Sequence, residues 1–489
     1  MGNIYIGNSL GTASKITNAY VGVNGISRKI KAIYVGVNGV ARLVWNGGIK
    51  KLLTKYLHCN MGSNPIKLYN TYSSRQTAGS ITSFKNSQLP SGFLCDVYSS
   101  YNDGTGTTYY YKSIQRFSLD NDYNLTNVGR VNYNYNWGGS RYDGSWYTSA
   151  STACDFYHEL GDYLFMCLRN VSDGSNSRRY YAIRDWSGNE ICSLDQASWI
   201  SNSVMPTSGV AFSNSTMVVG INSYSRLCLG VINFDGANLT QAYYYPTYVD
   251  SSGNSYYLRT INNRNVSVAR LENNIGIMAF QGATEQYSDL SVGGSIAVAF
   301  RLNSDGSITF GNAMYVKEGY SAQSNTTTGI LLGVDKNHAV MYDHYYSSSG
   351  SGYYYYSKKW FALYIDDNLN ITITHRYDFH NETGIYTDTD YPVSQIGRSA
   401  TFAVSEKKDY TDTTKNYGMY LYTLDTSTNK IVLLGEKILP QSCNVPYGYS
   451  TAIHNFSALG DDKFIYPKHS ATYSNATTTD LYAYVGKFE

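Results

Sequence analysis

Six times along the chain, an apolar strand candidate ends in an aspartate-containing turn, and the chain then resumes with Ile or Leu. The aspartates that open these turns are Asp120, Asp185, Asp235, Asp305, Asp366 and Asp425. Successive aspartates are 65, 50, 70, 61 and 59 residues apart, a mean near 61. Self-similarity at one long period is typical of repeat architectures, in which each period forms one supersecondary unit.

Each period also contains two further strand candidates before the turn, for example Tyr163–Leu168 ahead of Tyr180–Ile183. Four strands are the content of one propeller blade, and about seven periods fit between residue 49 and the last residue. We therefore expect residues 49–489 to form a β-propeller, with seven blades favoured. Six blades or two stacked β-sandwiches are the alternatives, because a count of periods tolerates one missed copy.

The composition agrees with an all-β chain. Tyr occupies 51 positions and charged residues make up only 15% of the sequence, against about 25% in ordinary soluble domains. Tyr, Thr and the other aromatic residues fit a pleated surface, whereas the helix formers Ala, Glu and Lys are sparse. This composition excludes an all-α fold. No run of 18 apolar residues occurs, so we expect no membrane span and no membrane partner.

Two local features of the propeller region carry further expectations. The alternating segment Leu481–Phe488 is suited to close the ring by pairing with a strand soon after residue 50, which removes an exposed edge.

The turn aspartates are expected to accept hydrogen bonds from backbone amides two residues on. Asp120–Asn124 and Asp366–Asn370 match only the first half of a calcium-binding loop, so we expect turn formation and no metal.

A tandem repeat lies near the N-terminus, where Ala19–Arg28 is followed fourteen residues later by Ile33–Arg42. Asn24-Gly25 and Asn38-Gly39 sit between β-branched residues, and Asn-Gly is the preferred pair for a two-residue hairpin turn. An isolated hairpin is marginally stable in water, so these units need each other or a partner surface. We expect residues 1–48 to form a small β-hairpin repeat module that docks onto another molecule.

The charge of this end of the chain supports docking. Residues 1–55 contain eight basic and no acidic residues, whereas the whole chain has a net charge of +2. Such asymmetry is typical of an end that meets an acidic partner. Nucleic acid is disfavoured because the basic residues are interleaved with turns instead of following one helix. The expected docking residues are Tyr20, Arg28, Lys29, Lys31, Tyr34, Arg42 and Trp45.

The tandem Tyr-Val-Gly-Val-Asn-Gly pattern, with lysine-containing spacers and the closing Leu43-Val44-Trp45, resembles a repeat of structural proteins from bacteriophages and prophages of Gram-positive bacteria. The resemblance covers residues 18–47, and the first copy has Ile26-Ser27 where the second has Val40-Ala41. It implies a virion location, on the tail or elsewhere on the particle, and several copies per particle. The implied partners of residues 1–48 are other virion proteins, and the implied site of synthesis is the host cytoplasm.

Cysteine usage fits a reducing compartment. The sequence contains no C-x-x-C motif, and most cysteines lie in apolar runs, so we expect them to be reduced. They are Cys59, Cys95, Cys154, Cys167, Cys192, Cys228 and Cys443.

Motifs for catalysis are missing from the sequence. The eight histidines form no H-E-x-x-H pattern, and no G-x-S-x-G, P-loop or Rossmann glycine pattern occurs. Glycan hydrolysis needs two carboxylates in one pocket, and nothing in the sequence brings the candidates together. Those candidates are Asp155, Glu159, Asp162, Asp343 and Glu382. We therefore expect no catalytic residues, no cofactor and no enzymatic activity.

Tyrosines gather beside Ser, Gly and Asn, a composition that antibody paratopes use for adaptable binding. Aromatic faces also suit sugar rings, which makes a host-surface glycan a candidate partner. The alternative is that these tyrosines only cover a β surface. The expected surface-binding residues are Tyr109, Tyr110, Tyr111, Tyr133, Tyr135, Trp137, Tyr243, Tyr244, Tyr245, Tyr353, Tyr354, Tyr355 and Tyr356.

Together these features predict a non-enzymatic phage virion protein, in which residues 1–48 dock onto the particle and the propeller is displayed for host-surface or neighbouring-protein binding. A host-polysaccharide depolymerase with a propeller active site is the alternative. A third hypothesis is a scaffold whose tyrosines serve only in packing against other virion proteins.

Overall fold

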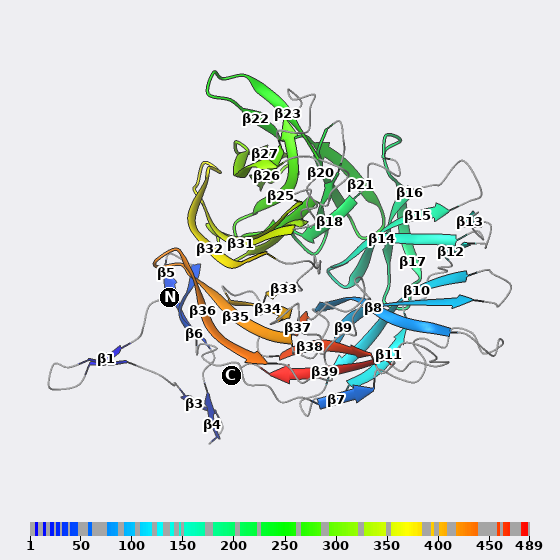
Figure 1. Ribbon diagram of the computed structural model, residues 1–489, viewed down its shortest axis with the longest axis horizontal. Helices are drawn as coiled ribbons and strands as arrows, with labels where there is room; N and C mark the ends of the chain where they lie inside the picture. The colour runs from blue at the N-terminus through cyan, green and yellow to red at the C-terminus, as the bar shows by residue number, and fades with distance from the viewer. Residues whose placement is uncertain are drawn as a thin grey trace.

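The structure is a computed structural model of the 489-residue chain. It describes residues 5–7, 13–15, 20–23, 26–29, 32–37, 40–46, 57–60, 76–86, 92–102, 108–119, 125–130, 137–140, 146–147, 151–171, 179–200, 206–222, 226–260, 266–284, 293–320, 327–348, 354–383, 393–395, 401–407, 417–438, 457–459, 463–469 and 481–487. Side chains are described mainly between residues 156 and 435. Within these residues every regular element is a β-strand, which confirms the all-β prediction (Figure 1).

Most of the strands form antiparallel sheets that follow one another around a ring, as in a propeller (Figure 1). Three sheets have the same order of four strands: β14–β17, β18–β21 and β29–β32. Their strands are β14 (Ser151–Leu160), β15 (Tyr163–Val171), β16 (Arg179–Arg184), β17 (Glu190–Asp195), β18 (Pro206–Ala211), β19 (Thr216–Ile221), β20 (Cys228–Phe234), β21 (Leu239–Tyr244), β29 (Thr327–Gly333), β30 (His338–Ser348), β31 (Tyr354–Ile365) and β32 (Ile371–Thr383).

The β33–β36 sheet has this same four-stranded order, whereas the β8–β13 and β22–β28 sheets vary the plan with additional short strands. Their strands are β8 (Gln76–Asn86), β9 (Gly92–Asn102), β10 (Thr108–Leu119), β11 (Leu125–Arg130), β12 (Trp137–Ser140), β13 (Trp146–Tyr147), β22 (Thr247–Val249), β23 (Ser255–Thr260), β24 (Val266–Arg270), β25 (Ile275–Thr284), β26 (Gly293–Leu302), β27 (Ile308–Phe310), β28 (Met314–Tyr320), β33 (Val393–Gln395), β34 (Thr401–Lys407), β35 (Tyr417–Asp425) and β36 (Lys430–Ile438).

The two ends of the propeller region meet in one sheet. Its strands are β37 (Ser457–Leu459), β38 (Lys463–His469), β39 (Leu481–Lys487) and β7 (Leu57–Asn60). β39 pairs antiparallel with β7, and Tyr484 lies opposite His58. The prediction that the C-terminal strand pairs with one soon after residue 50 is confirmed. The number of blades stays a prediction.

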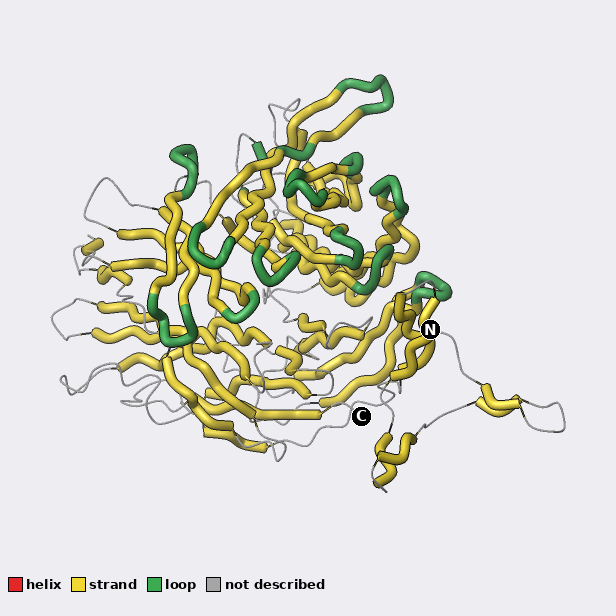
Figure 2. Tube along the Cα trace, turned by 180° about the vertical axis from the view of Figure 1, so that it is seen from behind, coloured by secondary structure: helices red, strands yellow, loops and turns green. Residues whose placement is uncertain are grey.

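The strands before residue 48 pair only within short sheets in the described part of the chain. β1 (Tyr5–Gly7) pairs with β2 (Ala13–Lys15), β3 (Tyr20–Val23) with β4 (Ile26–Lys29), and β5 (Ala32–Val37) with β6 (Val40–Asn46). In both overall views, β1–β2 and β3–β4 lie apart from the ring (Figures 1 and 2). The role of residues 1–48 as a docking module stays a prediction.

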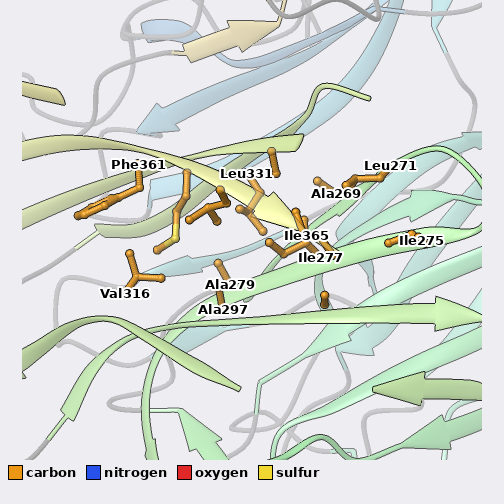
Figure 3. Close-up of a cluster of buried hydrophobic side chains, with 14 of the residues drawn as sticks. Ala269, Leu271, Ile275, Ile277, Ala279, Ala297, Val316, Leu331, Phe361 and Ile365 are labelled. Atoms are coloured by element: carbon orange, nitrogen blue, oxygen red, sulfur yellow. The ribbon is translucent and has the colours of Figure 1, made fainter. Parts of the chain in front are cut away.

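The hydrophobic core lies between neighbouring sheets. One cluster joins Ile277 and Ala297 of the β22–β28 sheet to Leu331, Phe361 and Ile365 of the β29–β32 sheet, and Figure 3 shows these side chains filling the space between the sheets. Similar clusters join the β14–β17 and β18–β21 sheets, and the β29–β32 and β33–β36 sheets. Each fully buried side chain of this size contributes about 1.5–3 kcal/mol of hydrophobic stabilisation, so adjacent sheets hold each other in place.

The turn aspartates behave as predicted from the sequence. In every described copy, Oδ1 accepts a hydrogen bond from the backbone N–H two residues on, at 2.8–3.0 Å. The predicted aspartates are Asp185, Asp235, Asp305, Asp366 and Asp425, and Asp250 in the β22–β23 turn, which the sequence did not single out, accepts the same bond. Asp120 lies outside the described residues. The expected turn-forming role is confirmed at these positions.

In a four-stranded meander, the turn between strands one and two and the turn between strands three and four lie at the same end of the sheet. The aspartate turns join strands three and four, for example β31 and β32. The turns between the first and second strands therefore open on the same side of the ring as the aspartate turns.

Two further observations concern the sequence expectations. No helix in the described part of the chain is long and apolar enough to cross a membrane. Cys167, Cys192 and Cys228 are free thiols, and the first and last of them are buried.

Candidate functional site

A cavity of about 730 Å³ lies where the first-to-second-strand turns of neighbouring sheets converge. The β14–β15, β18–β19, β24–β25 and β29–β30 turns all contribute to its lining. In a propeller the first strand of each blade faces the axis, so we call this cavity the channel mouth. The site is thus assembled from four segments that span residues 158–335.

Carboxylates dominate the charged lining of the channel mouth. Glu159 lies near the end of β14, Asp162 in the β14–β15 turn, Glu272 in the β24–β25 turn, and Asp335 in the β29–β30 turn. Asp162 and Glu272 are exposed to solvent, whereas Glu159 and Asp335 are partly buried. Arg270 is the guanidinium in the same lining. The excess of carboxylates over guanidinium groups makes the charged lining net negative and disfavours anionic ligands.

Two basic side chains of the lining are oriented by backbone oxygens. Arg270 Nη1 donates to the carbonyl of Ala211 at 3.2 Å, and the guanidinium lies 5.6 Å from the ring centre of Phe212. His158 Nδ1 lies 2.7 Å from the carbonyl oxygen of Glu159. Because a carbonyl can only accept, Nδ1 of His158 carries the proton in this contact.

Asp335 is held as an anion. Its Oδ1 accepts from the backbone N–H groups of Asn337 and His338 at 2.8 and 2.9 Å, and both carboxylate oxygens contact His338 Nδ1 at 2.8 and 2.9 Å. Burial alone would raise the pKa of Asp335, but the hydrogen bonds and the charge of His338 outweigh it and lower that pKa below its usual range. Asp335 is therefore a fixed negative charge in the wall of the channel mouth.

Of the residues that the sequence singled out for surface binding, three have described side chains. Tyr243 is half-buried, donates to Gln241 Oε1 and meets Trp199 edge-on with ring centres 5.0 Å apart. The hydroxyl of Tyr244 donates to the carbonyl of Gly306 at 3.3 Å. Tyr245 is 38% exposed. These tyrosines thus contribute to packing along β21 as well as to the surface.

The other predicted residues lie where side chains are not described. Some of them lie on strands whose backbone is described, namely Tyr20, Arg28, Lys29, Tyr34, Arg42, Trp45, Tyr109, Tyr110, Tyr111, Trp137, Tyr354, Tyr355 and Tyr356. Lys31, Tyr133, Tyr135 and Tyr353 fall outside the described residues.

Glu159 and Asp162 are among the carboxylates that the sequence offers for glycan hydrolysis without bringing any two of them together. The structure places both in the channel mouth. Sequence reasoning missed Glu272, Asp335 and Arg270. The sequence does contain a pattern that marks these turns: an acidic residue follows an apolar residue within two positions. Leu271-Glu272 and Val334-Asp335 are examples. Among residues with described side chains, no three His, Cys, Asp or Glu converge to hold a metal ion.

No family model matches the chain, and no curated protein sequence does. Solved structures similar to it include Hsv2 of Kluyveromyces lactis, at 10% identity and a TM-score of 0.38, covering 83% of this chain and 97% of that one. The α-L-arabinanase of Penicillium chrysogenum, complexed with arabinobiose, is 11% identical with a TM-score of 0.37, and the match covers 89% and 99% of the two chains.

The α-L-arabinofuranosidase Arb93A of Fusarium graminearum, in complex with an iminosugar inhibitor, is 8% identical with a TM-score of 0.36 and covers 90% of this chain and 98% of that one. At these values the likeness assigns no residue, substrate or activity. The expectation of a chain without enzymatic activity is not upheld by these comparisons, which include structures named as an arabinanase and an arabinofuranosidase. Local sequence could not test that expectation, because it cannot show that carboxylates from distant turns line one cavity.

Proposed function

We propose that the channel mouth hydrolyses glycosidic bonds of a neutral polysaccharide. The observation that carries this proposal is the convergence of Glu159, Asp162, Glu272 and Asp335 on one cavity. A volume of about 730 Å³ lies within the range of small-molecule sites, about 300–1,000 Å³. Glycosidases use one carboxylic acid and one carboxylate on either side of the scissile bond.

The environments of the carboxylates suggest a division of roles. Asp335 is fixed as an anion by His338 and stabilises positive charge that develops on the sugar ring. Glu159, which is partly enclosed, is assigned as the acid that protonates the leaving oxygen. Glu272, exposed at the rim, is assigned as the base that activates water. Arg270 and Asn214 supply donors for sugar hydroxyls.

The test is release of reducing ends from a panel of purified neutral polysaccharides. Glu159→Gln and Glu272→Gln should each lower kcat by about 100-fold or more, the usual contribution of a general acid or base. Glu190→Gln is the matched control, because Glu190 pairs with Arg184 at 2.9 Å on an outer strand and does not line the cavity. No turnover by the wild type, or unchanged rates in both variants, would refute the proposal.

We further propose that residues 1–48 attach this enzyme to a phage particle, which would make it a virion-borne depolymerase for host polysaccharide. The supporting observation is that β3–β4 and β5–β6 form two-stranded sheets that share no strand with the described ring sheets. Their repeat also resembles that of phage structural proteins. The tyrosines of Tyr109–Tyr111 and Tyr354–Tyr356 are proposed to contact the host surface.

Deletion of residues 1–48 tests attachment. The shortened chain should retain the unfolding transition of the propeller and the polysaccharide activity of the full chain, but should no longer join particles. A triple variant with Arg28→Ser, Lys29→Ser and Lys31→Ser should weaken incorporation without removing the hairpins. Normal incorporation of the shortened chain would remove the docking proposal and leave the hydrolase proposal standing.

A further inference from the structure

His338 lies at the junction of two sheets. It begins β30, is 9% exposed, and both of its ring nitrogens contact oxygen atoms. Nδ1 contacts the two carboxylate oxygens of Asp335 at 2.8 and 2.9 Å, and Nε2 lies 2.8 Å from Oδ1 of Asn429. Asn429 belongs to the turn between β35 and β36, so the imidazole links two neighbouring sheets.

These contacts select one protonation state. A neutral imidazole donates through one nitrogen only, whereas imidazolium donates through both. Carboxylate oxygens and an amide oxygen only accept, so the observed geometry is complete when His338 is protonated. Burial alone would lower the pKa of His338, but the hydrogen bond and charge of Asp335 and the bond to Asn429 raise it above its ordinary value.

The β35–β36 turn, which contains Asn429, is held by further hydrogen bonds to β32. The carbonyl of Asn429 accepts from the Thr374 hydroxyl at 3.2 Å, and the Ile431 N–H donates to His375 Nδ1 at 3.1 Å. Asn429 has a φ of 55°, a left-handed conformation that Asn tolerates better than most residues. The amide of Asn429 is thus positioned to receive the imidazolium.

We propose that His338, Asp335 and Asn429 form a pH-dependent clamp that ties the wall of the channel mouth to the neighbouring sheet, closed when His338 is protonated and weakened when it is neutral. The function of the clamp as a regulator of hydrolysis rests on the proposed activity of the channel mouth, whereas the clamp itself does not. His338 is in this view a positioning residue for Asp335, which lines the cavity.

Other ionisable groups lie on the elements around the clamp. Tyr364 on β31 meets the imidazole edge-on with ring centres 5.4 Å apart. Lys336 lies in the same turn as Asp335, His375 is on β32, and Asp425 and Lys430 bound the β35–β36 turn. Asp335 is the carboxylate in direct contact with the ring, and therefore sets its charge.

The pH range in which the clamp is stable follows from the directions of the two pKa shifts, upward at His338 and downward at Asp335. A raised pKa at His338 gives stability that is fully present below the ordinary value, about 6.5, and is lost as pH rises through the folded value. A lowered pKa at Asp335 gives stability that is present above about 3.9 and is lost as pH falls through the folded value. The clamp therefore contributes most between about pH 4 and 6.5.

The first test is an NMR titration of the His338 imidazole in the full chain without substrate. An apparent pKa above about 6.5 that decreases in the Asp335→Asn variant is the expected result. Asp366→Asn is the matched control, because Asp366 forms the same kind of turn in the same sheet but its described partners are Asn368 and Asn370. A titration at or below 6.5, or one that Asp335→Asn leaves unchanged, would overturn the clamp.

The second test compares unfolding midpoints from pH 6 to 9. As the pH rises, the unfolding midpoint of the wild type should fall relative to that of His338→Gln, because Gln keeps hydrogen-bonding capacity but does not titrate. Where hydrolysis is found, His338→Gln should also remove the alkaline decline in kcat that titration of His338 causes. A raised His338 titration together with no hydrolysis of any polysaccharide would refute the proposed activity and leave the clamp intact. A parallel pH dependence in the two proteins would refute the clamp.

Discussion

The rings of Trp360 and Phe402 lie with their centres 4.6 Å apart and join β31 of one sheet to β34 of the next. Both side chains are almost fully buried. Tyr422 stacks on Phe402 with ring centres 5.6 Å apart, and the ring centres of Tyr342 and Trp360 are 4.9 Å apart. Aromatic packing between sheets thus stabilises the same junction that the His338 clamp crosses.

Removal of Phe402 should therefore destabilise the whole ring. Phe402→Ala should lower the free energy of unfolding by about 3–5 kcal/mol, the usual cost of truncating a buried Phe. Urea denaturation would measure this loss. Phe310→Ala is the control, because Phe310 is only partly buried and its ring lies 6.4 Å from that of Phe300. Equal losses in the two variants would contradict a tightly packed junction.

Gly333 lies in the wall of the channel mouth against the backbone of the neighbouring sheet. A Cβ at Gly333 would lie 2.1 Å from the carbonyl oxygen of Arg270. The backbone cannot move aside as a flexible side chain can. Gly333→Ala should therefore lower the free energy of unfolding by about 1–3 kcal/mol, the usual cost of overpacking. Gly435→Ala is the matched control, because a Cβ there meets nothing within 4 Å. Thermal unfolding of the two variants should differ clearly, and equal midpoints would show that the sheets separate easily.

The aspartate turns should make stability fall in acid. The Asn370 side-chain amide, followed by the backbone amides of Asn370 and Asn368, lowers the pKa of Asp366. A lowered pKa gives stability that is present above the unfolded value, about 3.9, and is lost as pH falls through the folded value. Between pH 5 and 2 the unfolding midpoint of Asp366→Asn should decline less steeply than that of the wild type. Parallel curves would indicate that the unfolded chain retains this turn.

The described cysteines should differ in reactivity. Cys167 and Cys228 are buried, and burial raises the pKa of the Cys228 thiol. Cys192 is partly exposed, and its pKa is raised by burial and then by the charge of Asp235. Because the thiolate is the reactive form, iodoacetamide at pH 8 should label Cys192 slowly and the other two only after unfolding. Peptide mass spectrometry would reveal rapid labelling of Cys228, which would contradict its burial.

The sequence predicted the local features of the fold well. The aspartate turns depend on atoms two to four residues apart, so Asp185 and Asp366 form the expected contacts wherever they lie in the ring. The alternation of Leu481–Phe488 likewise predicted the strand that pairs with β7. Such features follow from backbone geometry and side-chain chemistry within one segment.

The channel mouth could not be predicted in the same way. Glu159 and Glu272 are 113 positions apart, and only the closure of successive sheets around an axis brings their turns to one cavity. His338 and Asn429 are 91 positions apart and meet for the same reason. The sequence by itself determined strands, turns and the all-β class, because these depend on neighbouring residues. The tertiary structure alone decided which acids share a cavity and which histidine links two sheets, because both depend on distances between segments that the chain keeps far apart in sequence.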